Sequence, residues 1–201
     1  MIAVIDYDAG NMKSVEKAFQ FLGEDVCITR DRQKILSASK IVLPGVGAFG
    51  DAMQRLRKYD LVEIIRRAVD DGKPFLGICL GLQLLFDRSD EAPGEEGLGI
   101  LKGNILRIPE SQGLKIPHMG WNSVKLEKES RIFRDIGDNP YFYFVHSYYL
   151  KADDPADVAA VTFYSTLIDA AVEHDNVFAS QFHPEKSSEI GLRVLKNFAE
   201  L

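Results

Sequence analysis

The sequence predicts an α/β protein whose central sheet is mixed but mostly parallel, with helices on its flanks. Two observations support this prediction. The first half of the chain alternates short buried-strand runs with segments of helical periodicity, and such strands pair in parallel because a helix must cross between them. After residue 88 the pattern changes: residues 90–97 read as a loop, and from residue 98 onward short β-type runs dominate, which indicates added antiparallel strands in the C-terminal half.

The first half divides at its turn signals into alternating strands and helices. We expect strands at 2–5, 25–29, 41–43 and 75–78, and helices at 12–22, 48–58, 60–72 and 80–86. Gly23 is a suitable end for the first helix. Asp60 is expected to cap the helix at 60–72 while Glu63 reaches back to complete a capping box, and Gly72 should end it.

The second half reads as strands followed by one helix. We expect strands at 105–108, 123–126, 141–145, 158–164, 170–173 and 177–182, then a helix at 188–200. Neither a repeat nor a low-complexity tract separates these elements. We therefore expect residues 1–201 to form a single domain, as the roughly 100–200 residues of a typical domain also suggest.

Composition excludes several classes of protein. The 24 Lys and Arg against 30 Asp and Glu give a net charge of −6, which argues against a general binder of nucleic acid or anionic membranes. The stretch 74–86 is shorter than the roughly 18 apolar residues of a membrane-spanning helix, and residues 1–6 read as a strand rather than a targeting peptide. Cys27 and Cys79 form no CxxC pair, so we expect a cytoplasmic protein without disulfides.

One motif carries chemistry. Gly77-Ile78-Cys79-Leu80-Gly81 lies where a buried strand meets a helix, the arrangement of a nucleophile elbow with cysteine in place of serine. The nucleophile must stand on a tight turn, and flanking glycines remove the Cβ atoms that would clash there. The N–H groups that open the following helix would favour a thiolate. A small buried cysteine is the alternative, but the strand-to-helix context favours function.

A thiolate nucleophile needs a base and a group that orients the base. His183 follows an apolar strand and precedes Pro184-Glu185. Residues two apart in an extended segment project to the same side, so Glu185 can reach the imidazole of His183. We predict a triad of Cys79, His183 and Glu185. His146 and His174 are interpreted as structural, and Cys27 is expected to face the core.

Acyl transfer also needs donors for the oxyanion. The glycine-rich turn 43–47 follows a parallel strand, at the sheet edge where ligands gather. The N–H of Val46 or Gly47, together with that of Leu80, could form the oxyanion hole. The sequence holds no HExxH, no histidine pair at helical spacing and no phosphate-binding GxxxxGK[ST], so we expect neither a metal nor a cofactor.

These residues carry a family resemblance that runs end to end. The chain resembles the class I glutamine amidotransferases, and within them the glutaminase subunits of imidazole glycerol phosphate synthase. The class signals are the cysteine elbow and His183-Pro184-Glu185; the subunit signals are Pro117-His118-Met119-Gly120-Trp121-Asn122 and the opening turn that ends in Gly10-Asn11. The resemblance implies a flavodoxin-like three-layer fold. The family's Asp-Tyr-Gly opening is here Asp6-Tyr7-Asp8, a departure at one turn position.

The resemblance also implies roles for single residues. Cys79 would attack the side-chain amide of glutamine, His183 would protonate the leaving ammonia, and Glu185 would orient the imidazole. Water would then hydrolyse the thioester and release glutamate. The residues that would hold glutamine are Gly47, Leu80, Gln83, Ser147 and Tyr148.

The family assigns use of the ammonia to another chain. That chain is a (β/α)₈-barrel synthase subunit, which would form a heterodimer with this one and make imidazole glycerol phosphate in histidine biosynthesis. Trp121 is the one tryptophan and suits an interface anchor, although a core position is its alternative. The expected docking residues are Asn11, Pro117, His118, Met119, Trp121, Asn122 and Lys186.

Two other functions stay open at this point. The chain could be the glutaminase of another class I amidotransferase, of the anthranilate synthase or pyridoxal phosphate synthase type, against which the segment 117–122 argues. It could also be a regulatory module that keeps the fold without turnover. The intact set of Cys79, His183 and Glu185 argues against that reading.

Overall fold

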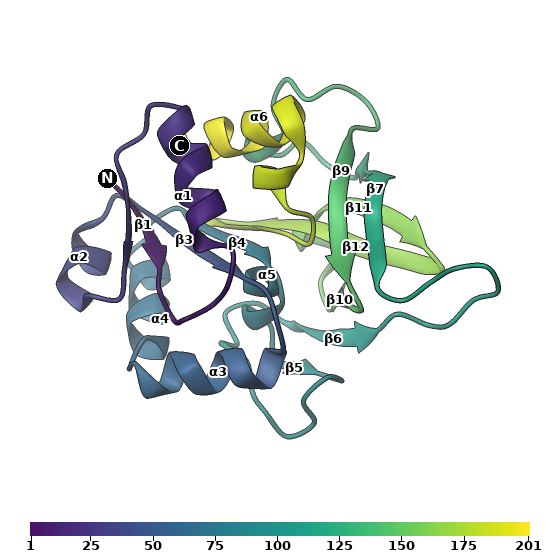
Figure 1. Ribbon diagram of the computed structural model, residues 1–201, viewed down its shortest axis with the longest axis horizontal. Coiled ribbons are helices and arrows are strands. Elements are labelled where there is room, and N and C mark those ends of the chain that lie inside the picture. The colour runs from purple at the N-terminus through teal and green to yellow at the C-terminus, as the bar shows by residue number, and fades with distance from the viewer.

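The computed structural model describes all 201 residues and has an eight-stranded sheet at its centre (Figure 1). Five strands run parallel, in the spatial order β2 (Val26–Thr29), β1 (Ile2–Ile5), β3 (Lys40–Gly45), β4 (Phe75–Cys79) and β13 (Val177–Ser180). Three antiparallel strands continue the sheet beyond β13: β12 (Thr166–His174), β11 (Val158–Tyr164) and β8 (Lys125–Leu126). The predicted mixed, mostly parallel sheet is therefore confirmed.

Helices cover both faces of this sheet. One face packs against α1 (Met12–Phe21) and α6 (Ser188–Ala199), and the other packs against α2 (Arg32–Ser37), α3 (Phe49–Lys58) and α4 (Val62–Asp70). Phe19 of α1 and Phe198 of α6 are fully buried, with their ring centroids 6.4 Å apart. Burying such a side chain stabilises the fold by about 1.5–3 kcal/mol, so each amphipathic helix holds its sheet face by its apolar stripe.

Two small sheets pack onto the C-terminal half. β7 (His118–Ser123) pairs with β9 (Tyr141–His146), and β10 (Tyr148–Ala152) pairs with β6 (Gly103–Arg107), which also pairs with β5 (Arg88–Ser89). Between β9 and β10 stands the single residue Ser147, so the chain turns sharply from one small sheet into the other. Short 3₁₀ turns at Arg131–Phe133, Pro155–Asp157 and Pro184–Lys186 complete the structure. No helix is both long and apolar enough to span a membrane.

The predicted start of the helix at 60–72 is wrong. Asp60 has φ of 53° and closes α3, because its N–H bonds to Arg57 O at 3.0 Å and the next N–H, of Leu61, bonds to Leu56 O at 2.9 Å. The helix that follows, α4, has no side-chain cap. Asp60 is thus a left-handed helix end rather than a capping residue.

Other differences lie in short elements. The six-residue α2 and the strand β10 were not expected. The predicted strand at 123–126 is divided by the fully buried Val124, whose N–H donates to Pro140 O instead of continuing either strand. The helix expected at 80–86 is the five-residue α5 (Leu80–Leu84). Cys27 is half-buried rather than in the core, with its Sγ 3.5 Å from Met1 Sδ.

Candidate active site

Cys79 occupies a strained elbow between β4 and α5. Its φ of 54° and ψ of −105° lie where side chains are rarely tolerated. A Cβ on Gly81 would stand 1.8 Å from Leu43 O, and one on Gly77 would stand 2.8 Å from Gly81 O. The expected reason for both glycines is therefore confirmed: the chain packs too closely against itself at this turn to admit side chains.

The pairing of β13 with β4 brings His183 to this elbow. Ser180 lies opposite Ile78 in the parallel register, so the segments that follow the two strands emerge at the same sheet edge. The N–H of His183 then donates to Tyr143 O at 2.9 Å, which anchors the segment to β9. Residues far apart in sequence thus line one site because their strands are neighbours.

His183 and Glu185 form a buried pair. His183 Nδ1 lies 2.7 Å from Glu185 Oε1, and both side chains have an exposed fraction of 0%. The extended geometry expected between them is wrong, because Pro184–Lys186 forms a 3₁₀ turn. The turn brings the carboxylate back onto the imidazole, so the predicted contact is present with a different backbone shape.

The charges around His183 set its protonation. Burial alone would lower the pKa of the imidazole, but Cys79 and Glu185 outweigh burial and raise that pKa to about 9. The imidazole is therefore protonated at neutral pH. A protonated imidazole beside a sulfur nucleophile is suited to act as a general acid toward a leaving amine.

The Cys79 sulfur and the His183 imidazole are not in hydrogen-bond contact. No hydrogen bond links Cys79 Sγ to His183 Nε2, and Nε2 and Glu185 Oε2 are buried without a hydrogen-bond partner. Cys79 Sγ instead lies 3.7 Å from Gln181 Nε2 and 4.0 Å from Val145 O. Catalytic contacts are often long in a free enzyme and shorten when substrate binds.

Asn11 touches the triad. Its Nδ2 donates to Glu185 Oε1 and lies 3.5 Å from His183 Nδ1. The side chain is half-buried, and its predicted part in docking stays a prediction. The Asn11 amide therefore lies against the Glu185 carboxylate, at the point where this carboxylate meets the His183 imidazole.

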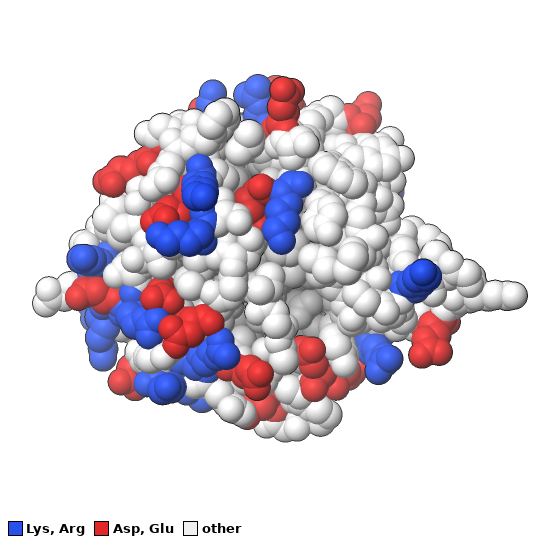
Figure 2. Space-filling model, in the orientation of Figure 1, with Lys and Arg blue, Asp and Glu red and all other residues white.

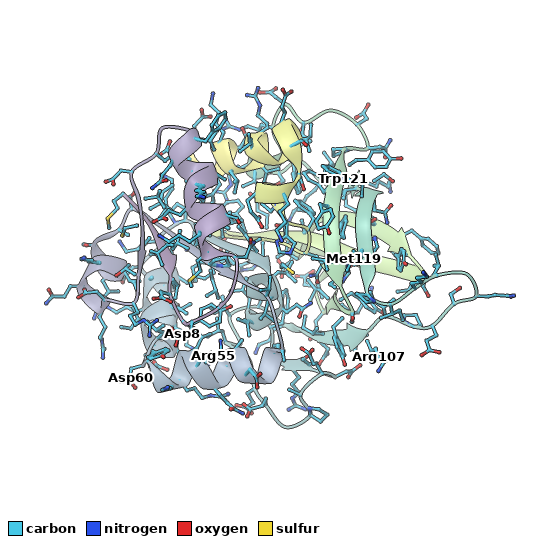
Figure 3. All side chains as sticks on the ribbon, viewed as in Figure 1. Asp8, Arg55, Asp60, Arg107, Met119 and Trp121 are labelled. Atoms are coloured by element: carbon cyan, nitrogen blue, oxygen red, sulfur yellow. The ribbon has the colours of Figure 1, made fainter.

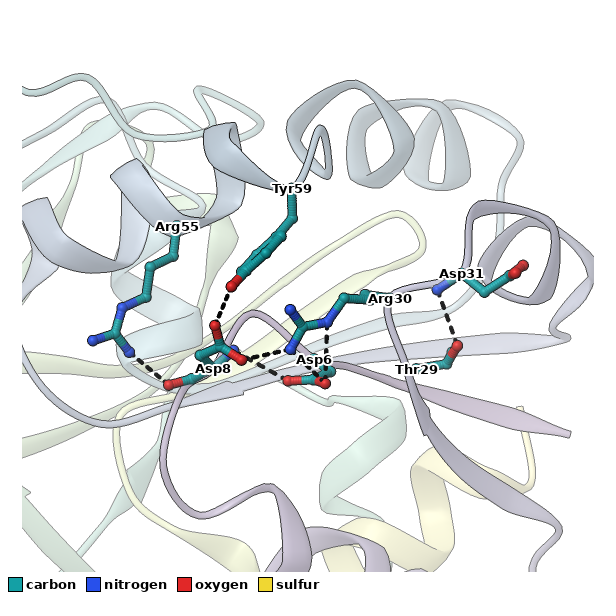
Figure 4. Close-up of polar contacts among 7 residues, drawn as sticks. All are labelled: Asp6, Asp8, Thr29, Arg30, Asp31, Arg55 and Tyr59. Atoms are coloured by element: carbon teal, nitrogen blue, oxygen red, sulfur yellow. Dashed lines mark hydrogen bonds and ion pairs between the residues drawn. The ribbon is translucent and has the colours of Figure 1, made fainter.

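Ion pairs and a tyrosine hydrogen bond hold Asp6 and Asp8, in the turn that leads to Asn11 (Figure 4). Arg30 Nη2 lies 2.7 Å from Asp6 Oδ2 and 2.5 Å from Asp8 Oδ1, and Tyr59 Oη also donates to Asp8. The hydroxyl of Tyr59 and the guanidinium of Arg30 hold the pKa of the Asp8 carboxyl below its usual value. Asp8 has φ of 60°, which explains why a glycine suits this position in the family and why aspartate, tolerant of left-handed φ, can replace it.

A cavity of about 300 Å³ opens beside Cys79. It is lined by Cys79 and by every residue predicted for the oxyanion hole and for glutamine binding: Val46, Gly47, Leu80, Gln83, Ser147 and Tyr148. Glu91, Pro117, Val145 and His146 complete the lining. A larger hollow of about 640 Å³ adjoins it and shares Ser147 and Tyr148, but it does not include the nucleophile.

The turn at Val46 and Gly47, predicted to supply the oxyanion hole, has unpaired N–H groups and lines this cavity. The N–H groups of Val46 and Gly47 donate no hydrogen bond within the chain, and Gly47 has φ of 110°. Tyr7 Oη donates to Pro44 O at 2.9 Å and so anchors the start of the turn from the core. Burial, and then the nearby Cys79, raise the pKa of Tyr7, so its hydroxyl keeps the proton that it donates.

Sequence reasoning missed three residues of the site. Gln181 is fully buried and bonds through Oε1 to Gln83 Nε2 at 3.0 Å. Glu91 accepts from the N–H of Phe49, at the start of α3, at 2.8 Å. His146 was interpreted as structural, yet it lines the cavity. Gln181 had one available signal, its place two residues before His183; Glu91 lies in an acidic loop that gave none.

The predicted docking residues on β7 alternate between exposed and less exposed positions. Met119 and Trp121 are 63% and 52% exposed, whereas His118, which precedes them and points to the opposite face of the strand, is 3% exposed. Figure 3 shows Met119 and Trp121 along β7, on the strand-rich side of the molecule, and Figure 2 shows few charged side chains there. Pro117 and Lys186 are exposed, and Asn122 is half-buried. His118 is a correction: buried, it cannot offer its ring to a partner.

The fold and this site together define a class of protein. The family model "Glutamine amidotransferase class-I" matches residues 3–201, so the chain belongs to the class I glutamine amidotransferases. A curated relative from Methanocaldococcus jannaschii, the imidazole glycerol phosphate synthase subunit HisH, is 49% identical over the full length of both chains. The same subunit from Caldanaerobacter subterraneus is 49% identical over 100% of this chain and 98% of its own. Within the class, the chain belongs with these HisH subunits.

Solved structures agree on the fold. A structure described as a glutamine amidotransferase aligns with a TM-score of 0.78 at 20% identity, covering 100% of this chain and 98% of that one. The structure of PurLQS from Thermotoga maritima aligns with a TM-score of 0.76 at 22% identity, covering 99% and 97%. At this identity the likeness concerns the fold alone.

Proposed function

We propose that the protein is the glutaminase subunit of an imidazole glycerol phosphate synthase and hydrolyses glutamine to glutamate and ammonia. The observation that carries this proposal is the cavity in which Cys79 stands beside the buried His183–Glu185 pair, with free N–H groups on the turn at Val46 and Gly47. Membership in the HisH subunits supports the assignment to histidine biosynthesis.

The reaction begins with attack of the Cys79 thiolate on the side-chain amide carbon of glutamine. The oxygen of that amide becomes an oxyanion, which the N–H groups of Val46, Gly47 and Leu80 stabilise; the position of these three residues in the wall of the Cys79 cavity supports this role. His183 gives the proton at Nε2 to the departing nitrogen, which leaves as ammonia, and a thioester remains on Cys79.

In the second half of the reaction His183 accepts a proton instead of donating one. A water molecule attacks the thioester while His183, now neutral, takes a proton from it. Glutamate leaves and Cys79 regains its thiolate form. Glu185 keeps the imidazole oriented through both steps by the 2.7 Å contact to Nδ1, and Asn11 steadies that carboxylate.

The ammonia passes to a separate (β/α)₈-barrel synthase subunit, with which this chain forms a heterodimer. The exposed pair Met119 and Trp121 on β7, together with Pro117 and Lys186, supplies the docking surface. Asn122 lies at its edge. Residues 1–201 act as one glutaminase domain in the cytoplasm and use no cofactor.

A glutaminase assay with and without the barrel subunit and its ribonucleotide ligand tests this proposal. We expect slow glutamine hydrolysis by the chain alone and strong stimulation by the liganded partner. Full activity of the isolated chain, or no response to the synthase subunit, would contradict the subunit assignment. Stimulation by an anthranilate or pyridoxal phosphate synthase partner instead would assign the chain to another amidotransferase.

A further inference from the structure

Two buried histidines connect the docking strand to the glutamine cavity. His118 of β7 and His146 of β9 lie directly opposite each other in the antiparallel register, and His118 Nδ1 is 3.0 Å from His146 Nε2. His146 Nδ1 in turn is 2.8 Å from the carbonyl oxygen of Tyr148. His118, His146 and the Tyr148 carbonyl therefore form a continuous line of hydrogen bonds that ends in the cavity wall.

The line has one possible direction of donation. A carbonyl oxygen can only accept, so His146 must carry its proton on Nδ1. Burial lowers the pKa of His146 to about 3 and that of His118 to about 4, so both rings are neutral at pH 7 and carry one proton each. His146 Nε2 is then an acceptor, and His118 Nδ1 must be the donor to it.

The tautomer of His118 also fixes the role of its second ring nitrogen. His118 Nε2 is left as an acceptor, and Asn122 Nδ2 lies 3.4 Å from it while also donating to Phe163 O at 3.1 Å. The His118 ring is stacked between Phe144 and Tyr164, with centroids 4.8 Å and 4.0 Å away. Packing on both faces keeps the ring in the plane that this line of bonds requires.

The other end of the line orients a glutamine-binding residue. Gln83 Nε2 donates to the Tyr148 carbonyl at 3.0 Å and to Gln181 Oε1 at 3.0 Å. These two bonds use both protons of the Gln83 amide and fix which way round it lies. Its oxygen is then the atom that remains for a donor group of the substrate.

We propose that His118 and His146 are positioning residues that hold the Tyr148 carbonyl, and through it the Gln83 amide, in the orientation that binds glutamine. This role deepens the proposed glutaminase function and rests on it. Neither histidine touches the reacting atoms, so their effect falls on substrate binding rather than on the chemistry at Cys79.

Two variants of His118 test the role. His118→Phe keeps an aromatic ring between Phe144 and Tyr164 but removes the donor, whereas His118→Asn places an amide N–H close to the position of Nδ1. With the synthase subunit and its ligand present, we expect His118→Phe to raise the KM for glutamine about tenfold, because it leaves His146 Nε2 buried without a donor. We expect kcat to change less than about threefold, and His118→Asn to recover most of the KM.

Controls separate this effect from general damage. His174→Phe removes a half-exposed histidine outside the cavity and should leave KM unchanged. The rate at which iodoacetamide alkylates Cys79 in the absence of glutamine should be equal in wild type and His118→Phe. An unchanged KM in His118→Phe, or a KM raised equally in His118→Asn, would overturn the positioning role.

A second measurement needs no turnover. The ¹⁵N spectrum of histidine-labelled full-length protein should show both His118 and His146 neutral and protonated on Nδ1 at pH 7. A proton on Nε2 of either ring would contradict the direction of the hydrogen bonds and overturn the proposal. A wild-type protein that releases no ammonia with its liganded partner contradicts the proposed function itself. Wild-type activity with an unaltered KM in His118→Phe contradicts the positioning role alone.

Discussion

At the scale of single residues, the chemistry of the site depends on the charge of His183. Its imidazole is buried, and it stays protonated because Glu185 and Cys79 lie beside it and raise its pKa to about 9. A group whose folded pKa exceeds the unfolded value stabilises the fold fully below the unfolded pKa, here 6.5. That contribution is lost as the pH rises through about 9.

Replacing Glu185 with Gln should move this pKa. We expect the alkaline limb of the glutaminase pH profile, near pH 9 in wild type, to shift down by about one pH unit in Glu185→Gln, because a neutral amide no longer favours the imidazolium. The difference in urea midpoint between the two proteins should be largest near pH 6 and should shrink above pH 9. A pH profile that coincides with that of wild type would show that Glu185 does not set the charge of His183.

The turn at Cys79 also requires glycine on both sides, because the backbone packs too closely there to admit a Cβ atom. A Cβ at Gly81 would meet the backbone oxygen of Leu43, which cannot move without breaking β3. We expect Gly81→Ala to lower the free energy of unfolding by at least about 2 kcal/mol, measured by urea denaturation, and to remove most glutaminase activity. Gly50→Ala, where the nearest atom is the Ala92 Cβ at 3.2 Å, is the matched control and should change stability by less than about 1 kcal/mol. Equal effects at both positions would refute the packing argument.

At the scale of elements, the junction of α3 and α4 shows how a turn signal can be misread. Asp60 followed by Glu63 matches a capping box in sequence, but the left-handed backbone of Asp60 ends α3 instead. Asp60→Gly should therefore raise the free energy of unfolding by about 0.5–1 kcal/mol, because glycine adopts positive φ without strain. Thermal or urea unfolding measures it. A capping residue would give the opposite sign, a small loss.

Strand β7 directs alternate side chains to solvent and to the protein interior. Its outward residues Met119 and Trp121 are exposed, and its inward residue His118 faces the core. We expect Trp121→Ala to weaken binding of the synthase subunit at least about thirtyfold by isothermal titration calorimetry, as anchors of this type usually do. Phe21→Ala, on α1 and 78% exposed, is the control for a surface aromatic and should leave affinity unchanged. If both variants bind alike, Trp121 is not an anchor.

At the scale of the whole molecule, the alternating strands and helices of the first half could be predicted because each element carries its own local pattern. The flanking glycines of Cys79 and the contact of His183 with Glu185 were likewise visible as local spacing. The glycine-rich turn pointed to Val46 and Gly47, and the resemblance to a known family supplied Gln83, Ser147 and Tyr148. Local pattern and family motif therefore account for the core and for the proposed triad.

The remaining features depend on contacts between distant segments. Gln181 and Cys79 are 102 residues apart, and they meet because β13 pairs with β4, a choice of neighbour that no local pattern encodes. The sharp passage from β9 to β10 places His146 in the cavity wall, where its own strand pattern predicted core packing. The burial of His118 follows from stacking on Tyr164 of β11, another distant contact.

We propose that Cys79 is the nucleophile of a glutaminase that serves a synthase partner. Ammonia release from glutamine, measured for wild type and Cys79→Ala in the presence of the liganded synthase subunit, tests it most directly. We expect stimulated release by wild type, none by Cys79→Ala, and equal affinity of both for the partner, because Cys79 is 5% exposed and does not belong to the docking surface. Ammonia release that persists in Cys79→Ala would contradict it.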